Sequence, residues 1–142
     1  MFLVTCVLVI VMKIAVQASD LDHARIDGTR VYVLELLKRF GKLDPSISFQ
    51  LYHKGSFNPL LTPPTFPNYE TYALPFPKAW MQTRFAWEMF RVHPEKLFLP
   101  IQAAPFFLPS HMEVTATIHD LAWKRYPETF PLRDRWKLDW ML

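Results

Sequence analysis

The sequence predicts an α/β fold, with a mostly parallel sheet and helices on both faces. Short apolar or alternating segments that suit strands are separated by segments with helical periodicity, and this alternation is typical of parallel sheets. The chain has 142 residues, of which 51% are hydrophobic, so it can form one compact domain with a buried core.

The first strand is predicted at residues 14–18, an apolar run of the kind that is buried on both faces. A helix is predicted at residues 29–40, because one apolar stripe repeats at i, i+3, i+4 and i+7: Val33, Leu36, Leu37 and Phe40. We expect Asp27 or Thr29 to cap the start of this helix and Gly41 to end it in a left-handed conformation.

Four further strands are expected, at residues 47–53, 69–74, 96–99 and 114–118. The strand at 69–74 is short because six prolines between Pro59 and Pro77 exclude a helix there. The tail, residues 133–142, has a helical pattern that stops without a capping signal, which indicates a truncated chain.

A second helix is predicted at residues 78–92. It carries a narrow polar stripe of Arg84, Glu88 and Arg91. Apolar residues cover the rest of its surface: Trp80, Met81, Phe85, Trp87, Met89 and Phe90. The simplest interpretation is a core helix. Its apolar arc is wider than one packed face requires, so contact with a lipid surface, a partner helix or a missing domain stays open.

Residues 1–11 form an apolar extension that precedes the predicted domain at residues 12–142. Three interpretations are open: an extension upstream of a true start at Met12, a cleaved signal peptide, or an interfacial anchor. The single cysteine, Cys6, excludes an internal disulfide and fits a reducing compartment. We therefore expect a cytoplasmic protein, with contact at the inner face of the membrane as an alternative.

Charge and glycine content exclude several function classes. The net charge is +3 and acids lie between the scattered basic residues, which does not indicate nucleic-acid binding but leaves an anionic ligand or a membrane surface as partners. The chain has three glycines, too sparsely placed for a dinucleotide fingerprint or a Walker loop.

Two segments combine polar chemistry with the carboxyl ends of predicted strands, where ligands bind in open α/β sheets. Gly28, Thr29 and Arg30 open the first helix, where free N–H groups and the helix dipole favour an anion that Arg30 would clamp. Alternatively, Gly28 only turns the chain and Arg30 is solvated. His119 follows the last strand and is suited to bind a sugar hydroxyl or an oxyanion, or to a structural role. The neighbouring Asp120 is expected to cap the following turn.

No metal site is predicted. Asp20 and Asp22 have the spacing of a carboxylate pair that can hold a divalent cation, but an aspartate pair after a strand more often stabilises a turn. The five histidines show no i, i+4 pairing and have no cysteine beside them, which argues against zinc.

Several of these pieces, taken in order, resemble the family 4 glycosyltransferases. Residues 12–16 and 26–37 resemble the first strand, glycine loop and helix of that family. The match is strongest at residues 117–131, which are similar to the segment T-I-H-D-L-x-x-x-x-x-P-E-x-F-P of those enzymes. The resemblance covers nearly all of residues 12–142.

The resemblance implies a two-domain GT-B architecture, with this chain as its Rossmann-like N-terminal, acceptor-side half. Such enzymes transfer a sugar from a nucleotide-sugar donor to a hydroxyl of a sugar or lipid-linked acceptor, with retention and usually without a metal or other cofactor. His119 would contact the transferred sugar, Asp120 would lie beside it, and Gly28, Thr29 and Arg30 would lie near the donor diphosphate.

Two departures from the family pattern qualify these expectations. The loop has one glycine, Gly28, where relatives often have two or three. The donor-binding half is absent, so we expect little or no transferase activity from this chain alone. The alternative is a non-catalytic α/β module that binds an anionic ligand or a partner protein.

Overall fold

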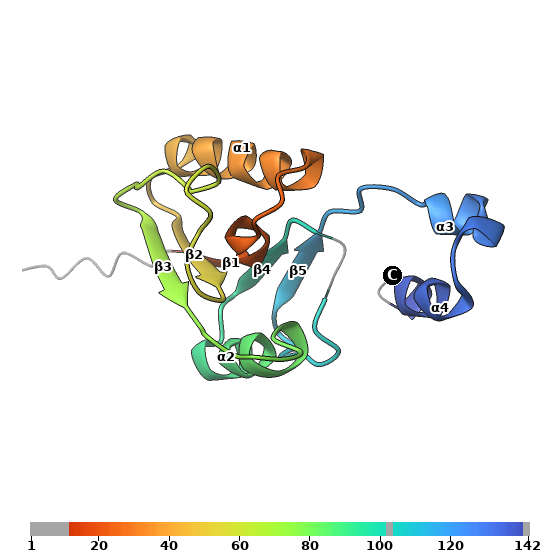
Figure 1. Cartoon of the computed structure of the whole chain (residues 1–142). Coiled ribbons are helices and arrows are strands. Elements are labelled where there is room, and N and C mark those ends of the chain that lie inside the picture. Colours follow the sequence, from red (N-terminus) through yellow and green to blue (C-terminus); the bar gives the residue numbers. More distant parts are fainter. Residues whose placement is uncertain (1–11, 102–103, 141–142) are drawn as a thin grey trace, which may run out of the picture.

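The computed structural model describes residues 12–101 and 104–140. They form a five-stranded sheet in which every neighbouring pair is parallel, in the order β3-β2-β1-β4-β5 (Figure 1). The strands are β1 Lys13–Gln17, β2 Ser48–His53, β3 Tyr69–Ala73, β4 Lys96–Leu99 and β5 Glu113–Ala116. The predicted α/β fold with a parallel sheet is therefore confirmed. The predicted extension at residues 1–11 lies outside the described residues.

The strand order reverses at β1. From β1 the chain proceeds outward to β2 and β3, then returns to place β4 on the other side of β1. Loops that follow β1 and β4 consequently leave the sheet in opposite directions. The carboxyl ends of these two strands flank a crevice, which is the usual ligand position in open α/β sheets.

Helix α1, Gly28–Leu43, covers one face of the sheet. Its buried residues pack on a cluster that includes Val16, Leu51 and Phe49, and Phe40 stacks on Phe49. Of the two predicted caps, the structure selects Asp27, whose side chain accepts a hydrogen bond from the N–H of Arg30.

The predicted role of Gly41 is wrong. The helix continues through Gly41 to Leu43, and no described glycine has a positive φ. Gly41 is buried, and a Cβ atom at this position would overlap the ring of Phe66. Glycine is needed here because the 59–68 segment lies close against the helix.

The opposite face is covered by a π-helical turn, Met81–Phe85, followed by helix α2, Ala86–Val92. The helical segment was predicted to begin at residue 78 but begins at Met81, because Ala79 has a left-handed backbone, with φ 49°. The indole of Trp80 then donates to the carbonyl of Leu74 at 2.7 Å, and Trp80, Phe85 and Met89 enter the core.

Glu88, in the predicted polar stripe, is only 2% exposed. Its carboxylate accepts hydrogen bonds from Arg84, at 2.6 Å, and from Arg91. These bonds compensate the desolvation of the carboxylate and hold its pKa below the usual value, Arg91 making the larger contribution. Trp87, by contrast, faces outward. Helix α2 therefore buries one residue of its predicted polar stripe and exposes one of its predicted apolar residues.

After β5 the chain leaves the sheet and forms α3 Ala122–Arg125, a 3-10 turn Pro127–Thr129, and α4 Leu132–Trp140 (Figure 1). The indole N–H of Trp123 donates to Asp139 at 3.0 Å and joins α3 to α4. Strand β5 ends at Ala116, two residues earlier than predicted, although the N–H of Thr117 still donates to the carbonyl of Leu99 at 2.9 Å.

Candidate functional site

The candidate site lies where the carboxyl ends of β1, β4 and β5 meet. Gln17 is the last residue of β1, Pro100 and Ile101 follow β4, and the 117–121 segment follows β5. Because parallel strands end on the same edge, the loops that the sequence singled out after β1 and β5 are brought to one side of the sheet.

His119 is exposed on this edge. Its Nε2 lies 2.9 Å from the carbonyl oxygen of Pro100. A carbonyl can only accept, so Nε2 carries the hydrogen, and in the neutral imidazole Nδ1 keeps its lone pair. Within residues 12–101 and 104–140, no group forms a hydrogen bond with Nδ1. The ring is therefore fixed through one nitrogen and offers the other as an acceptor.

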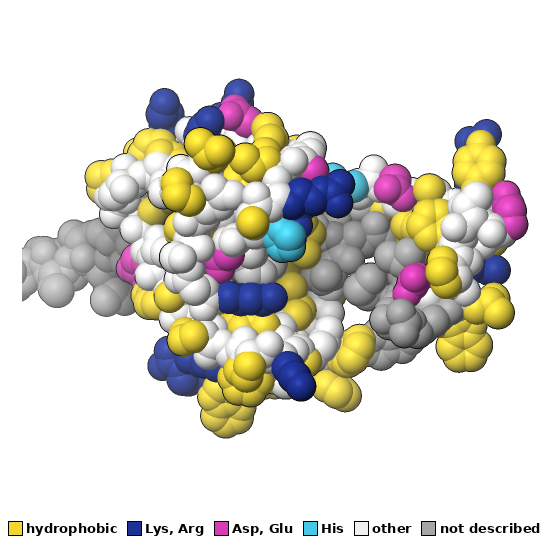
Figure 2. Space-filling view, viewed as in Figure 1, with side chains coloured by type: hydrophobic (Ala, Val, Ile, Leu, Met, Phe, Trp, Pro, Cys, Tyr) yellow, Lys and Arg dark blue, Asp and Glu magenta, His cyan; other side chains and the backbone are white. Residues whose placement is uncertain are grey.

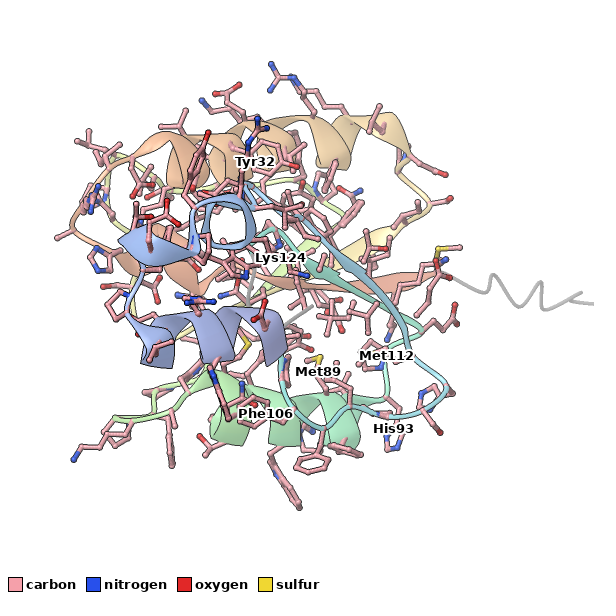
Figure 3. All side chains as sticks on the ribbon, turned by 90° about the vertical axis from the view of Figure 1, so that its right-hand side faces the viewer. Tyr32, Met89, His93, Phe106, Met112 and Lys124 are labelled. Carbon is pink, nitrogen blue, oxygen red and sulfur yellow. The ribbon has the colours of Figure 1, made fainter. Side chains whose placement is uncertain are left out.

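Tyr32 of α1 holds the imidazole from the side. The two ring centroids lie 5.2 Å apart with the planes at 90°, and the Tyr32 hydroxyl lies 3.4 Å from Oγ1 of Thr117. Figure 3 shows Tyr32 on α1, at the place where the chain that leaves β5 passes the helix. Gly28 is one helical turn before Tyr32, hence on the same face of α1. The structure thus places His119 against Tyr32, one helical turn from the start of α1.

The first turn of α1 has two backbone N–H groups that no described group accepts from, those of Gly28 and Thr29. The N–H groups of Arg30 and Val31 both donate to Asp27. The Arg30 hydrogen bond is the main reason why the pKa of Asp27 lies below its usual value. The open N–H groups are available to a ligand.

Arg30 is already engaged by two carboxylates. Its guanidinium forms an ion pair with Asp27 and lies 3.8 Å from Asp20, and most of its side chain is covered. Its Nε is buried and has no hydrogen-bond partner in the described chain. Clamping an anion through Arg30 would displace one of these carboxylates, so the structure assigns the guanidinium first to holding the loop after β1.

A cavity of about 240 Å³ opens in the crevice. It is lined by Gln17, Ser19, Asp20, His23, Lys54, Trp80, Met81 and Ile101. Gln17 is 1% exposed, and its Nε2 donates to Ser19 at 2.6 Å and to Asp20 at 3.3 Å. Its Oε1 is buried with no partner among the described residues. An unfilled buried acceptor favours a ligand or water that brings an O–H or N–H group.

The two aspartates of the predicted pair have different partners. Asp20 lies between Gln17 and Arg30, whereas Asp22 accepts from the backbone N–H groups of Lys54 and Gly55 and lies 2.9 Å from Nδ1 of His53. In the described parts of the chain, no cluster of three histidine, cysteine or acidic side chains could hold a metal ion. The Asp22 carboxylate instead joins the loops after β1 and β2.

Asp120 caps a turn, as the sequence analysis expected. Its Oδ1 accepts the N–H of Ala122 at 3.0 Å, at the start of α3. Its role beside a substrate stays a prediction, and its position next to His119 is consistent with it.

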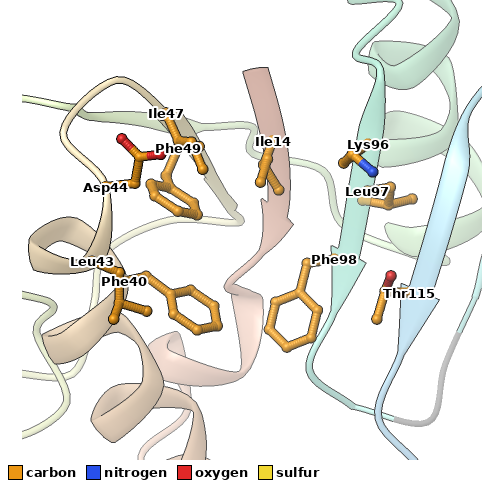
Figure 4. A pocket seen from close by; sticks show the side chains of 10 residues that line it. All are labelled: Ile14, Phe40, Leu43, Asp44, Ile47, Phe49, Lys96, Leu97, Phe98 and Thr115. Carbon is orange, nitrogen blue, oxygen red and sulfur yellow. The ribbon is translucent and has the colours of Figure 1, made fainter. Parts of the chain in front are cut away.

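A second hollow, of about 350 Å³, lies on the α1 face near the amino ends of the strands (Figure 4). Phe40, Phe49 and Phe98 form much of its wall, with Asp44 and Lys96 among the few polar residues. This hollow exists because α1 packs over β1 and β2, while the chain after β5 leaves β4 and β5 uncovered on this face. It is distant along the strands from His119 and Gln17.

Comparison with protein-family models, with curated proteins and with solved structures finds no match to this chain. Among the helices that the structure describes, none is long and apolar enough to cross a membrane.

Three residues of the site escaped the sequence analysis: Gln17, Tyr32 and Lys54. Gln17 carried a usable signal, since it is the only polar residue within the apolar run at 14–18. A polar residue at the carboxyl end of a buried strand points toward a ligand edge. Tyr32 and Lys54 carried no such signal, because their positions depend on strand order.

Proposed function

We propose that this chain is the acceptor-side half of a retaining glycosyltransferase, which transfers a sugar from a nucleotide-sugar donor to a hydroxyl acceptor. The observation that carries the proposal is the exposed His119 at the carboxyl edge of the sheet, with Nδ1 open and its ring against Tyr32 of α1. The resemblance of residues 117–131 to the glycosyltransferase segment supports the same assignment.

In this proposal, His119 positions the transferred sugar. Its Nδ1 accepts a hydrogen bond from a sugar hydroxyl, while the Pro100 carbonyl and the Tyr32 ring keep the imidazole from turning. A fixed ring contributes to the rate by holding the anomeric carbon where the acceptor can reach it. Proton removal from the acceptor is not assigned to His119.

During transfer, the bond between the anomeric carbon and a diphosphate oxygen breaks, and a new bond forms to the acceptor oxygen, whose proton passes to a departing phosphate oxygen or to water. Negative charge increases on the departing diphosphate. The open N–H groups of Gly28 and Thr29, at the positive end of α1, are suited to stabilise that charge. Most of the donor affinity is assigned to a second half of the enzyme.

The cavity at Gln17 is suited to the acceptor. Its volume, about 240 Å³, is below the roughly 300–1,000 Å³ of sites for drug-sized ligands. It therefore suits one small hydroxylated group rather than a whole nucleotide sugar. The unfilled Gln17 acceptor, the Asp20 carboxylate and the Lys54 ammonium supply both acceptors and donors for hydroxyl groups.

The test joins this chain to a donor-binding half of GT-B architecture and measures release of nucleoside diphosphate from a panel of nucleotide sugars. We expect turnover that His119→Ala lowers about 100-fold, as misplacing a reactant does. His111→Ala, an exposed histidine next to the start of β5, is the matched control. Absence of turnover with the whole panel, an equal effect of both variants, or a strict requirement for a divalent metal contradicts the proposal.

A further inference from the structure

Helix α2 exposes aromatic side chains where a surface helix normally carries polar ones. Trp87 is 67% exposed, and Phe90 is also exposed, on the stripe that begins at Thr83. Burying these rings would release ordered water and lower the free energy, so an exposed pair on one helical stripe indicates a surface that is covered in use.

The segment that precedes β5 extends this surface. Phe107 is 79% exposed and Phe106 is 52% exposed. The side chain of Gln82, in the π-helical turn, holds this segment beside α2: it donates to the carbonyl of Ala104 at 3.0 Å and accepts the N–H of Phe106 at 2.7 Å. Figure 3 shows Phe106 next to α2. We call Trp87, Phe90, Phe106 and Phe107 the aromatic face.

Basic side chains flank the aromatic face. Lys78 is exposed, Arg91 is 61% exposed and Arg84 is partly exposed. Residues 76–92 contain a single acid, Glu88, which is buried and paired with both arginines. Figure 2 shows apolar side chains projecting from the lower margin of the molecule, over α2, with Lys and Arg side chains beside them. Within residues 76–92 the exposed charge is therefore positive.

We propose that the aromatic face binds the headgroup region of a bilayer that contains anionic phospholipid. Tryptophan and phenylalanine bury their rings at the boundary between headgroups and acyl chains, and lysine and arginine contact lipid phosphates. This inference rests on α2 and not on the site at His119, so it stands independently of the proposed transferase activity.

The charge pattern argues against a second copy of the chain as the occupant. A symmetric dimer brings the same patch of both copies together. Here that contact would oppose Arg84, Arg91 and Lys78 of one copy to the same three residues of the other, without an exposed acid to compensate them. An anionic lipid surface supplies the complementary charge.

The test is flotation of the full chain with vesicles of pure phosphatidylcholine and with vesicles of equal parts phosphatidylcholine and phosphatidylglycerol. We expect binding to the anionic vesicles, weakened by salt, and little binding to the zwitterionic ones. The double variant Trp87→Ser, Phe107→Ser should bind about tenfold more weakly, because two exposed rings no longer insert. Lys78→Gln should bind about fivefold more weakly.

Trp136→Ser is the matched control, since Trp136 is also 79% exposed but lies on α4. It should bind the vesicles like the unaltered chain. Circular dichroism should show that all variants are folded, because the altered side chains lie outside the core. Binding that persists unchanged in the double variant overturns the proposal, as does equal binding to both vesicle types. A change of oligomeric state in the double variant, measured by sedimentation, identifies a protein interface instead and also overturns it.

Discussion

The rings of Tyr32 and His119 pack at a right angle, with their centroids 5.2 Å apart. Tyr32 belongs to the helix after β1, and His119 to the loop after β5, so this contact fastens the last strand's exit to the first helix. A ligand that contacts both the start of α1 and His119 therefore meets two groups whose relative position is fixed before it binds.

Replacing Tyr32 should loosen this connection. We expect Tyr32→Ala to lower the free energy of unfolding by about 1 kcal/mol, the range of an edge-to-face aromatic pair. Tyr32→Phe keeps the ring and should cost less, because the hydroxyl lies 3.4 Å from Thr117, at the long end of hydrogen bonding. Urea denaturation of both variants, combined with His119→Ala in a double-mutant cycle, measures the coupling. Strictly additive effects would show that the ring contact contributes nothing.

Two glycines of α1 should respond oppositely to alanine. Gly41→Ala forces a methyl group into the ring of Phe66 and should lower the free energy of unfolding by about 1–3 kcal/mol. Gly28→Ala meets no atom within 4 Å and gains helix propensity, so it should be neutral or slightly stabilising. Thermal unfolding of the pair checks this prediction, and a larger loss at Gly28 than at Gly41 would refute it.

Glu88 should make stability depend on acid pH. Its carboxylate is bound by Arg91 and Arg84, which holds its pKa below the ordinary value of 4.5. A lowered pKa contributes stability that is present above pH 4.5 and is lost as the pH falls through the lowered value. Glu88→Gln should therefore cost about 2 kcal/mol near neutral pH and weaken the dependence of stability on pH below 4.5.

Glu35→Gln is the control for Glu88. Glu35 also pairs with two cations, Lys38 and Arg39, but on the exposed surface of α1. Removing this exposed carboxylate should change the free energy of unfolding much less than removing the buried one, because solvent screens its ion pairs. Urea titrations at several pH values compare the two variants. Equal losses would mean that the burial of Glu88 has no energetic consequence.

Gln17 should matter more for binding than for folding. Gln17→Met keeps the length of the side chain and removes a buried oxygen that has no partner in the described chain, at the cost of the Nε2 bonds to Ser19 and Asp20. We expect the free energy of unfolding to change by less than about 1 kcal/mol, because the two effects offset one another. Chemical denaturation tests this. A loss of several kcal/mol would show that the amide is retained for stability.

The regular elements were predictable because their periodicity is local. The stripe from Val33 to Phe40 determines which side of α1 meets the sheet, and the prolines before Tyr69 exclude a helix there. The role of Gly41 was predicted wrongly because the ring that it contacts belongs to Phe66, in a segment distant along the chain. A local sequence pattern does not reveal such a contact. The 84, 88, 91 spacing predicted that Glu88 lies on one polar stripe with Arg84 and Arg91, but nothing in that spacing states that the carboxylate is buried.

The site was predictable only in outline. His119 and Gly28 were identified because each adjoins the carboxyl end of a strand or the start of a helix. Their meeting through Tyr32 depends on β4 and β5 lying on the far side of β1, which is a property of topology and not of local pattern. The engagement of Arg30 by Asp20 and Asp27 likewise requires the folded loop.

The central position of β1 in the sheet has a consequence for local opening of the structure and hence for amide hydrogen exchange. Its residues Ala15, Val16 and Gln17 are sealed between neighbouring strands and both helical layers, so their amide protons should be among the last to exchange with deuterium. β5 lies at the sheet margin with all four residues exposed, and should exchange early. The strand that carries Gln17 should therefore open rarely, whereas the segment that carries His119 follows the strand that should open most readily. A bound ligand should slow amide exchange first in the segment that carries His119.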